Sequence, residues 1–199
     1  QLPDVRNIHS RKGMPMEDPH QRDSRSTYPD RIFRFCPRCG SGGLIAGGGK
    51  PFVCGGCGFE YYINAAAAVV ALIEDSENRL LLTRRARDPK IGTLDLPGGF
   101  VNVHETAEHA LIREVREELH LELAGFSYFG SFPNTYPYGG ITYFTLDLAF
   151  VCSVPDLSTL QAGDDAASYI FIPLQDIRLK DIGLDSIQKI VSLYIDSRS

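Results

Sequence analysis

Residues 99–121 read GFVNVHETAEHALIREVREELHL, and the rest of the chain is interpreted from this stretch. Its apolar residues recur at steps of three and four, which predicts an amphipathic helix with one buried stripe. The stripe consists of Ala107, Ala110, Leu111, Val115 and Leu119. Thr106 stands where a helix N-cap is expected, and Glu108 in the first turn suits the positive end of the helix dipole.

Three glutamates, Glu114, Glu117 and Glu118, fall within an arc of roughly 100° beside that stripe. Carboxylates at these spacings repel one another in an isolated helix. A hard divalent cation would reverse the sign of that interaction, because Mg²⁺ binds oxygen ligands and keeps waters or phosphate oxygens in its shell. The alternative is an ordinary solvated helix face. The glutamates therefore indicate either a Mg²⁺ or Mn²⁺ site for work on a phosphate or a charged surface.

The spacing of the fixed residues around these glutamates is more specific. From Gly99 to Leu121 the stretch matches G-x5-E-x7-R-E-U-x-E-E-x-G-U, where U is aliphatic, at every fixed position except His120. It resembles the signature of the Nudix hydrolases, which have Gly at that position. The family's Gly ends the helix in a left-handed turn, so His120 should carry some backbone strain there, although His is among the better-tolerated residue types.

The resemblance implies an α/β/α sandwich with a mixed sheet, which is also the natural architecture for strands interspersed with helices. It implies a substrate in which a nucleoside diphosphate is linked to another group. Water attacks one phosphorus of the pyrophosphate, and metal ions neutralise the phosphate oxygens and help to ionise the water. By resemblance, the metal is held by glutamates, one of them through water, and an arginine orients the carboxylates. These residues are Glu114, Glu117 and Glu118, then Glu105 through water, and Arg113.

The general base is open between two kinds of candidate. One of the helix glutamates can serve, or an acidic residue in the loop before the last expected strand, where Asp164 and Asp165 follow Gly163. We favour Asp165. Its alternative role is that of an ordinary turn aspartate beside a glycine.

Cysteine spacing predicts a second metal site nearer the N-terminus. Two C-x2-C-G knuckles, Cys36 to Cys39 and Cys54 to Cys57, are separated by fourteen residues. The glycine after each pair permits the tight turn that aims two thiolates at one ion, and four thiolates suit a closed, structural Zn²⁺ site. Two disulfides or redox-active thiols are the alternatives, and a reducing compartment disfavours disulfides. The fifth cysteine, Cys152, lies in an apolar run and is interpreted as a small buried hydrophobe.

Composition divides the chain into three parts: a flexible N-terminal tail over residues 1–31, a zinc ribbon over 32–62 and the Nudix-like domain over 63–199. The net charge of −5 does not indicate a general nucleic-acid-binding surface. The longest apolar run, residues 65–73, is too short to span a bilayer, and no signal segment opens the chain. We therefore expect a cytoplasmic protein without membrane partners.

Strand patterns precede the acidic helix. Residues 65–74 and 79–84 read as two strands that a polar turn joins into a hairpin. Gly98 and Gly99 follow a further short strand, and their lack of a side chain lets the backbone approach a ligand closely. We therefore expect these glycines to contact the substrate.

Further strand patterns follow the helix. Residues 123–132 and 141–154 read as strands joined by an aromatic, proline-rich loop at 133–140, and a later short strand precedes the last helix. Asp185 or Ser186 is expected to cap that helix.

A zinc ribbon directly before a Nudix-like domain resembles the NADH pyrophosphatases, which include enzymes that act on NAD-capped RNA. These carry S-Q-P-W-P-F-P-x-S shortly after the signature, and residues 131–139 read SFPNTYPYG at the same offset. The serine and two prolines match, and Phe132 and three other residues depart. The position of Pro137 after the signature is similar to that of a characteristic proline of ADP-ribose pyrophosphatases. The position of Tyr138 is similar to that of a characteristic tyrosine of diadenosine-polyphosphate hydrolases. The resemblance implies NADH, NAD, ADP-ribose or a related dinucleotide as substrate and AMP as product.

Aromatic residues along this stretch offer a surface for the bases of such a substrate. Flat rings of this kind stack on adenine or nicotinamide, and the candidates are Phe132, Tyr136, Tyr138 and Tyr143. The alternative is that these rings simply pack the sheet.

Two other classes of function stay open. A non-catalytic Nudix-fold sensor would bind ADP-ribose or a similar ligand and regulate a partner, although such proteins often lose signature glutamates. An RNA-acting protein would remove NAD caps and use Arg34, Arg38 and Lys50 of the ribbon as nucleic-acid contacts. Relatives with ribbons are often dimers, so a homodimer is expected by analogy alone.

Overall fold

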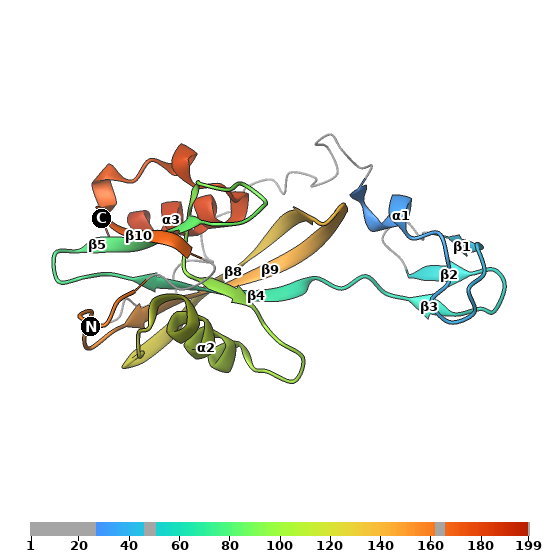
Figure 1. The fold of residues 1–199 in the computed structure, drawn as a ribbon, viewed down its shortest axis with the longest axis horizontal. Coiled ribbons are helices and arrows are strands. Elements are labelled where there is room, and N and C mark those ends of the chain that lie inside the picture. The colour runs from blue at the N-terminus through green and yellow to red at the C-terminus, as the bar shows by residue number, and fades with distance from the viewer. Residues whose placement is uncertain (1–26, 46–50, 162–165, 199) are drawn as a thin grey trace. The chain divides into compact units, whose positions relative to one another are not determined.

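The computed structural model describes residues 27–45, 51–161 and 166–198. These residues form two compact units. We call them the sheet unit, which holds the described residues of 66–134 and 145–198, and the ribbon unit, which holds those of 27–65 and 135–144. Figure 1 labels the elements of both units. Of the flexible tail expected at residues 1–31, residues 1–26 lie outside the described residues.

The sheet unit is built on two sheets. The first has the order β7-β4-β9-β8, with β4 parallel to β9 and antiparallel to β7, so the sheet is mixed. The second is antiparallel and has the order β10-β5-β6. The strands are β4 (Ala66–Ile73), β5 (Arg79–Arg85), β6 (Leu94–Asp95), β7 (Gly98–Phe100), β8 (Gly125–Tyr138), β9 (Ile141–Ser153) and β10 (Ala166–Pro173).

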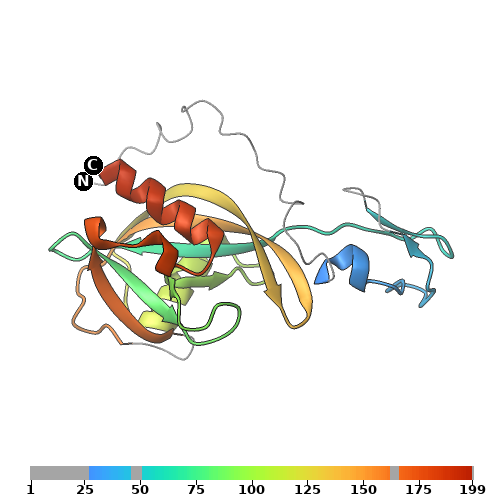
Figure 2. The ribbon, with the colours of Figure 1, turned by 90° about the horizontal axis from the view of Figure 1, so that it is seen from above.

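Two helices cover opposite faces of these strands, α2 (Ala107–Leu119) and α3 (Asp185–Arg198), as Figures 1 and 2 show. Successive side chains of a strand point to opposite faces, and β4 divides accordingly. Val69, Ala71 and Ile73 pack with the buried stripe of α2, whereas Val70 and Leu72 pack with α3. This arrangement confirms the predicted α/β/α sandwich with a mixed sheet.

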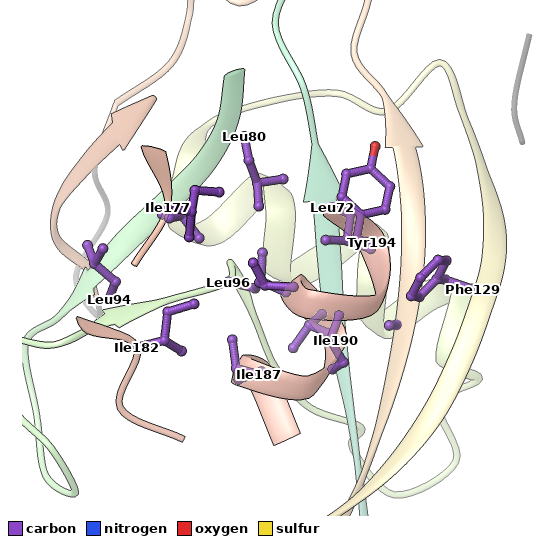
Figure 3. Close-up of a cluster of buried hydrophobic side chains, with 14 of the residues drawn as sticks. Leu72, Leu80, Leu94, Leu96, Phe129, Ile177, Ile182, Ile187, Ile190 and Tyr194 are labelled. Carbon is purple, nitrogen blue, oxygen red and sulfur yellow. The ribbon is translucent and has the colours of Figure 1, made fainter. Parts of the chain in front are cut away.

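The core on the α3 side is shown in Figure 3. Ile187 and Ile190 of α3 pack against Leu72 and Leu80 of the two sheets, and the ring of Tyr194 meets Phe129 edge to face. Each such side chain contributes about 1.5–3 kcal/mol when it is fully buried. Two short 3-10 helices, Leu174–Asp176 and Leu179–Asp181, lead from β10 to α3. The core on this face therefore holds α3 against both sheets.

The predicted turn between the first two strands is present, since the Asp75 N–H donates to the Arg79 carbonyl at 3.1 Å, but the two strands do not pair along their length. β4 and β5 lie in different sheets and share only one isolated bridge, between Glu74 and Leu80. β5 pairs instead with β10 over its whole length, from Arg79 opposite Pro173 to Arg85 opposite Ala166. Apolar strands joined by a short turn resemble a hairpin in sequence, but the pattern does not say which strand each one pairs with.

The predicted loop at 133–140 is also wrong, because β8 continues as a strand to Tyr138. The turn to β9 is only Gly139-Gly140, with φ angles of 58° and 80°, and two such residues make the tight turn of a hairpin. Pro133 and Pro137 are tolerated because β8 is at the edge of its sheet. Their spacing of four places both missing N–H groups on the same side of the strand, and an edge strand can leave that side unpaired.

The start of the last helix differs from the prediction as well. Asp185 is already the first residue of α3, so neither it nor Ser186 is the N-cap. The Ser186 hydroxyl instead donates a hydrogen bond to the buried carboxylate of Asp147 on β9. Ser186 therefore joins α3 to the sheet.

The ribbon unit contains a three-stranded antiparallel sheet in the order β1-β2-β3 and a single helical turn. These elements are β1 (Leu44–Ile45), β2 (Phe52–Cys54), β3 (Glu60–Tyr61) and α1 (Pro29–Ile32). Phe33 packs against the rings of Phe52 and Tyr61 at centroid distances of 6.1 and 6.3 Å. Tyr28 meets Phe144 edge to face at 5.5 Å, which ties the helical turn to the tip of the β8–β9 hairpin. Among the described helices, none has both the length and the apolar character needed to cross a bilayer.

Candidate functional site

The ends of α2 fix the register of its glutamates. The Thr106 hydroxyl accepts a hydrogen bond from the His109 N–H at 3.2 Å, which confirms the predicted N-cap. At the other end His120 has φ 56° and ψ 31°, so the left-handed turn forms with His in place of Gly. The Thr159 hydroxyl and the Gln161 N–H donate to the carbonyls of His120 and Leu119, which satisfies two acceptors that a helix end leaves free.

Arg113 organises the acidic face of α2. Its Nε and Nη2 donate to the two carboxylate oxygens of Glu105 at 2.8 and 2.9 Å. Its Nη1 donates to Glu114 at 2.7 Å and to Glu117 at 3.1 Å, and Nη2 also donates to the Phe100 carbonyl at 3.0 Å. One guanidinium therefore holds three carboxylates and the end of β7 in a fixed geometry.

The two glycines before the helix bring β7 against it. A Cβ at Gly98, whose φ is 150°, would collide with the Val69 carbonyl of β4. The Gly98 N–H donates to Glu118 at 3.0 Å, and a Cβ at Gly99 would lie 2.5 Å from the Glu114 carboxylate. The close approaches that the structure shows at these glycines are thus to the protein's own backbone and to the acidic cluster.

The pKa values of the cluster diverge because its members differ in partners and burial. The Arg113 guanidinium and the Asn102 N–H lower the pKa of Glu105 to about 2. Burial raises the pKa of Glu114, and this effect exceeds the attraction of Arg113. The three carboxylates raise the pKa of Arg113 above its usual value, with Glu105 the largest cause.

Among the described residues, only the four ribbon cysteines form a group of three or more potential ligands within 4.8 Å of one another. The acidic face of α2 instead offers separate oxygen donors. Its groups are carboxylate oxygens, which Mg²⁺ and Mn²⁺ prefer. The Glu114 side chain is 14% exposed and the Glu117 side chain is 59% exposed. One end of the acidic face is therefore largely buried by protein, and the other is open to solvent. Such a face leaves coordination positions for waters and phosphate oxygens, as a catalytic metal site requires.

The remaining predicted site residues are an aspartate and three aromatic residues. Asp165, the favoured general base, lies outside the described residues, as does Asp164. Phe132 is only 6% exposed and packs in the core with α3, so its ring faces protein. Tyr136 and Tyr138 lie on the part of β8 that belongs to the ribbon unit, with ring centroids 6.3 Å apart.

The four ribbon cysteines form a compact set of thiols. All five cysteines of the chain are free, and the four sulfurs lie within 4.8 Å of one another. Cys36 and Cys57 Sγ are 3.8 Å apart, and Cys39 and Cys54 Sγ are 3.7 Å apart. Ligands about 2.3 Å from a tetrahedral zinc would be about 3.8 Å from one another. The sulfurs therefore fit Zn²⁺, and neither alternative disulfide is present.

The two knuckles have the same backbone geometry, which explains why the sulfurs converge. The N–H of Gly40 donates to the Cys36 carbonyl, and that of Gly58 donates to the Cys54 carbonyl, each at 2.9 Å. Both glycines have positive φ, 72° and 69°, as predicted from their position after each cysteine pair.

Sequence reasoning missed the backbone groups of this site. The Gly98 N–H and the Phe100 carbonyl hold Glu118 and Arg113, and every residue but proline carries such groups, so the sequence holds no signal for them. Glu105 was expected to contact metal through water, and the structure shows that it binds Arg113 directly.

Comparison with known proteins gives the family. The model of the NUDIX domain matches residues 64–192. The NAD-capped RNA hydrolase NudC of Vibrio atlanticus is 31% identical over 144 residues, which are 72% of this chain and 52% of that protein. The ADP-ribose pyrophosphatase of Methanocaldococcus jannaschii is 36% identical over 121 residues, which are 60% of this chain and 68% of that protein.

A solved Nudix hydrolase from Nitrosomonas europaea has a similar fold, with a TM-score of 0.61 and 25% identity over 83% of this chain and 92% of that one. The chain spans about half the length of the NudC relative that it matches. The family match covers well over half of the chain and includes β4, α2 and most of α3. The chain therefore belongs to the Nudix family.

Proposed function

We propose that this protein hydrolyses the pyrophosphate bond of a nucleoside diphosphate linked to another group, with Mg²⁺ or Mn²⁺, and releases AMP. The observation that carries the proposal is the acidic face of α2, where Arg113 holds Glu105, Glu114 and Glu117 together. One guanidinium charge faces three carboxylates here, so the mutual repulsion of the carboxylates is only partly offset. A divalent cation relieves that repulsion and would hold the two phosphates of a substrate.

Each residue has a distinct part in this proposal. Glu114, Glu117 and Glu118 would hold the cation, which when bound polarises the phosphate oxygens and the attacking water. Arg113 and Glu105 keep the carboxylates oriented, and Gly98 fixes Glu118 through its N–H.

We propose two candidates for the general base. Asp165 would take the proton of the attacking water, or a helix glutamate would do so. Replacing Asp165 with Asn decides between them. A fall in kcat with unchanged KM supports Asp165, and an unchanged kcat assigns the base to the helix.

The proposed substrates are NADH or NAD and ADP-ribose. The names of the two relatives support this class, since one is an NAD-capped RNA hydrolase and the other an ADP-ribose pyrophosphatase. The exposed ring of Tyr138, and the half-buried ring of Tyr136 beside it, would stack on adenine or nicotinamide. Removal of an NAD cap from RNA is the second candidate, supported by the NudC relative and by the adjoining ribbon.

Three further features belong to the proposal. The four cysteines would hold a structural Zn²⁺, because four thiolates leave no coordination position for substrate. Their free thiols support a reducing compartment, and we propose the cytoplasm. A homodimer rests on the family resemblance alone.

The test is a product assay with Mg²⁺ on NADH, NAD, ADP-ribose and diadenosine polyphosphates. We expect AMP from at least one of the first three. Glu117→Gln should lower kcat by about 100-fold or more without a loss of folded protein, because this side chain is 59% exposed. Glu122→Gln is the matched control, since it lies just past the same helix and pairs only with Arg116 among the described residues. Tight binding of a nucleotide without turnover would overturn the proposal in favour of a sensor.

A further inference from the structure

A groove of about 440 Å³ lies wholly within the ribbon unit. Its lining combines cationic, aromatic and backbone surfaces. The lining residues are Asp30, Arg31, Phe33, Arg34, Phe35, Gly42 and Leu44. Sites for small ligands occupy about 300–1,000 Å³, so one nucleotide fits this volume. We infer that the groove binds single-stranded RNA, with one nucleotide seated in it. The purpose of this binding rests on the proposed function, because it would deliver a capped RNA end to the enzyme.

The first knuckle builds the wall of the groove. The Cys36 N–H donates to the Ser41 carbonyl at 2.8 Å, which closes the knuckle and brings the residues on its two sides together. Those residues are Phe35 and Gly42, and a Cβ at Gly42 would stand 3.9 Å from the Phe35 ring. Gly42 thus leaves open the space beside that ring.

The two phenylalanines of the groove have different roles. Phe33 is fixed by its contacts with Phe52 and Tyr61 and belongs to the small core of the ribbon unit. Phe35 is 70% exposed, although exposing a ring of this size to water is unfavourable. A base stacked on its face would remove that exposure, and base–aromatic stacking is how single strands are commonly held.

Three arginines lie on the same segment of chain as the exposed ring. Arg31 and Arg34 line the groove, and Arg38 lies exposed on the same segment. The described residues of the ribbon unit hold these three arginines against two carboxylates, Asp30 and Glu60. This local excess of positive charge contrasts with the net charge of −5 of the whole chain. Several arginines along one segment suit successive phosphates of a strand.

Asp30 favours RNA over DNA. It lines the groove with its side chain 45% exposed, and its contact with Arg31 is long at 3.9 Å. A carboxylate there would repel phosphates, but it can accept a hydrogen bond from a ribose 2′-OH. That hydroxyl is the group by which a protein distinguishes RNA from DNA.

The test is fluorescence anisotropy of the full chain with a labelled single-stranded RNA of about ten nucleotides. We expect Arg34→Gln and Phe35→Ala each to weaken binding by about ten-fold, and Arg34→Gln to lower the salt slope by about 0.7. Gly42→Leu fills the groove without removing a charge and should weaken binding as much. Arg178→Gln, an exposed arginine of the sheet unit, is the control. Zinc per chain is measured in each variant, so loss of the ribbon is recognised.

Several outcomes would overturn the inference. They are equal affinity in all groove variants that keep their zinc, equal binding of DNA of the same sequence, equal binding of an acidic peptide, and competition by AMP as strong as that by the oligonucleotide. Hydrolysis of ADP-ribose and NADH is measured in parallel and should be unchanged in the groove variants. A protein that binds RNA through the groove but hydrolyses no pyrophosphate would contradict the proposed function and leave this inference standing.

Discussion

The two candidate metal sites of this chain are built in opposite ways. In the ribbon unit four thiols from two knuckles lie within 4.8 Å of one another and enclose the place of the ion. In the sheet unit the carboxylates lie along one face of α2 and are held by Arg113, with Glu117 open to solvent. The first arrangement suits an ion that holds the protein together, and the second suits an ion that must also bind water and substrate.

The two sites also differ in how far the surrounding protein stabilises them without a metal. The ribbon unit has strands of two or three residues and a small aromatic core, so its burial alone provides little stability. The sheet unit holds α2 through a buried stripe and two capped ends, whether or not a cation is present. We therefore expect the ribbon metal to be needed for folding and the metal on α2 to be needed only for chemistry.

Removal of zinc should have the largest effect. Structural zinc contributes about 10–16 kcal/mol of apparent binding energy in small zinc domains. We expect Cys36→Ser to abolish zinc binding and the hydrogen-exchange protection of β2 and β3, while α2 and β4 stay protected. The measurement is native hydrogen exchange by mass spectrometry. Cys152 lies in the core of the sheet unit, so Cys152→Ser is the control, and this variant should keep the zinc of the ribbon unit. Loss of protection in both units of Cys36→Ser would show that the sheet unit depends on the ribbon.

Glycine replacement should affect the two units unequally. Gly98→Ala places a methyl group into the Val69 carbonyl and should cost about 3 kcal/mol in the free energy of unfolding. Gly40 has a φ of 72°, but nothing lies within 4 Å of the position of an added Cβ. Gly40→Ala should therefore lower the free energy of unfolding by only about 1 kcal/mol. Urea denaturation of the zinc-loaded variants measures both. Equal costs would mean that the contact between β7 and β4 is looser than described.

Acid should weaken the Arg113 cluster in a defined pH range. Because Arg113 lowers the pKa of Glu105 from 4.5 to about 2, their interaction is complete above pH 4.5 and is lost as the pH falls through 2. The melting temperature of Glu105→Gln should therefore lie below that of the unaltered protein by a constant amount from pH 7 to 5. The difference should narrow below pH 4.5. A difference that grows toward low pH would contradict the assigned ion pair.

The smallest effect should come from the end of α2. His120→Gly removes a side chain from a left-handed conformation and should raise the free energy of unfolding by about 1 kcal/mol. Guanidinium denaturation measures this change, and the hydrolytic rate should stay the same. A destabilised variant would mean that the His120 side chain makes a contact worth more than the strain.

The sequence predicted those features that depend on local periodicity or spacing. The 3.6-residue repeat of apolar residues gave the bounds and buried face of α2, and the cysteine spacing gave the cluster of Cys36, Cys39, Cys54 and Cys57. Pairing partners were not predictable, because β4 and β5 are equally apolar whichever sheet they join. The strand at 133–138 was missed because proline usually marks a loop, and only the edge position of β8 tolerates it. Contacts made by backbone groups, such as the Phe100 carbonyl on Arg113, carry no sequence signal.

We propose that the carboxylates of α2 hold a catalytic cation that is separate from the zinc. The most direct measurement is AMP release from ADP-ribose during a Mg²⁺ titration of protein that has been dialysed free of Mg²⁺ and retains one zinc per chain. We expect no AMP without Mg²⁺ and a saturable rise in the rate of AMP release as Mg²⁺ is added, at constant zinc content. AMP release that is independent of Mg²⁺, or that follows the zinc content instead, would contradict it.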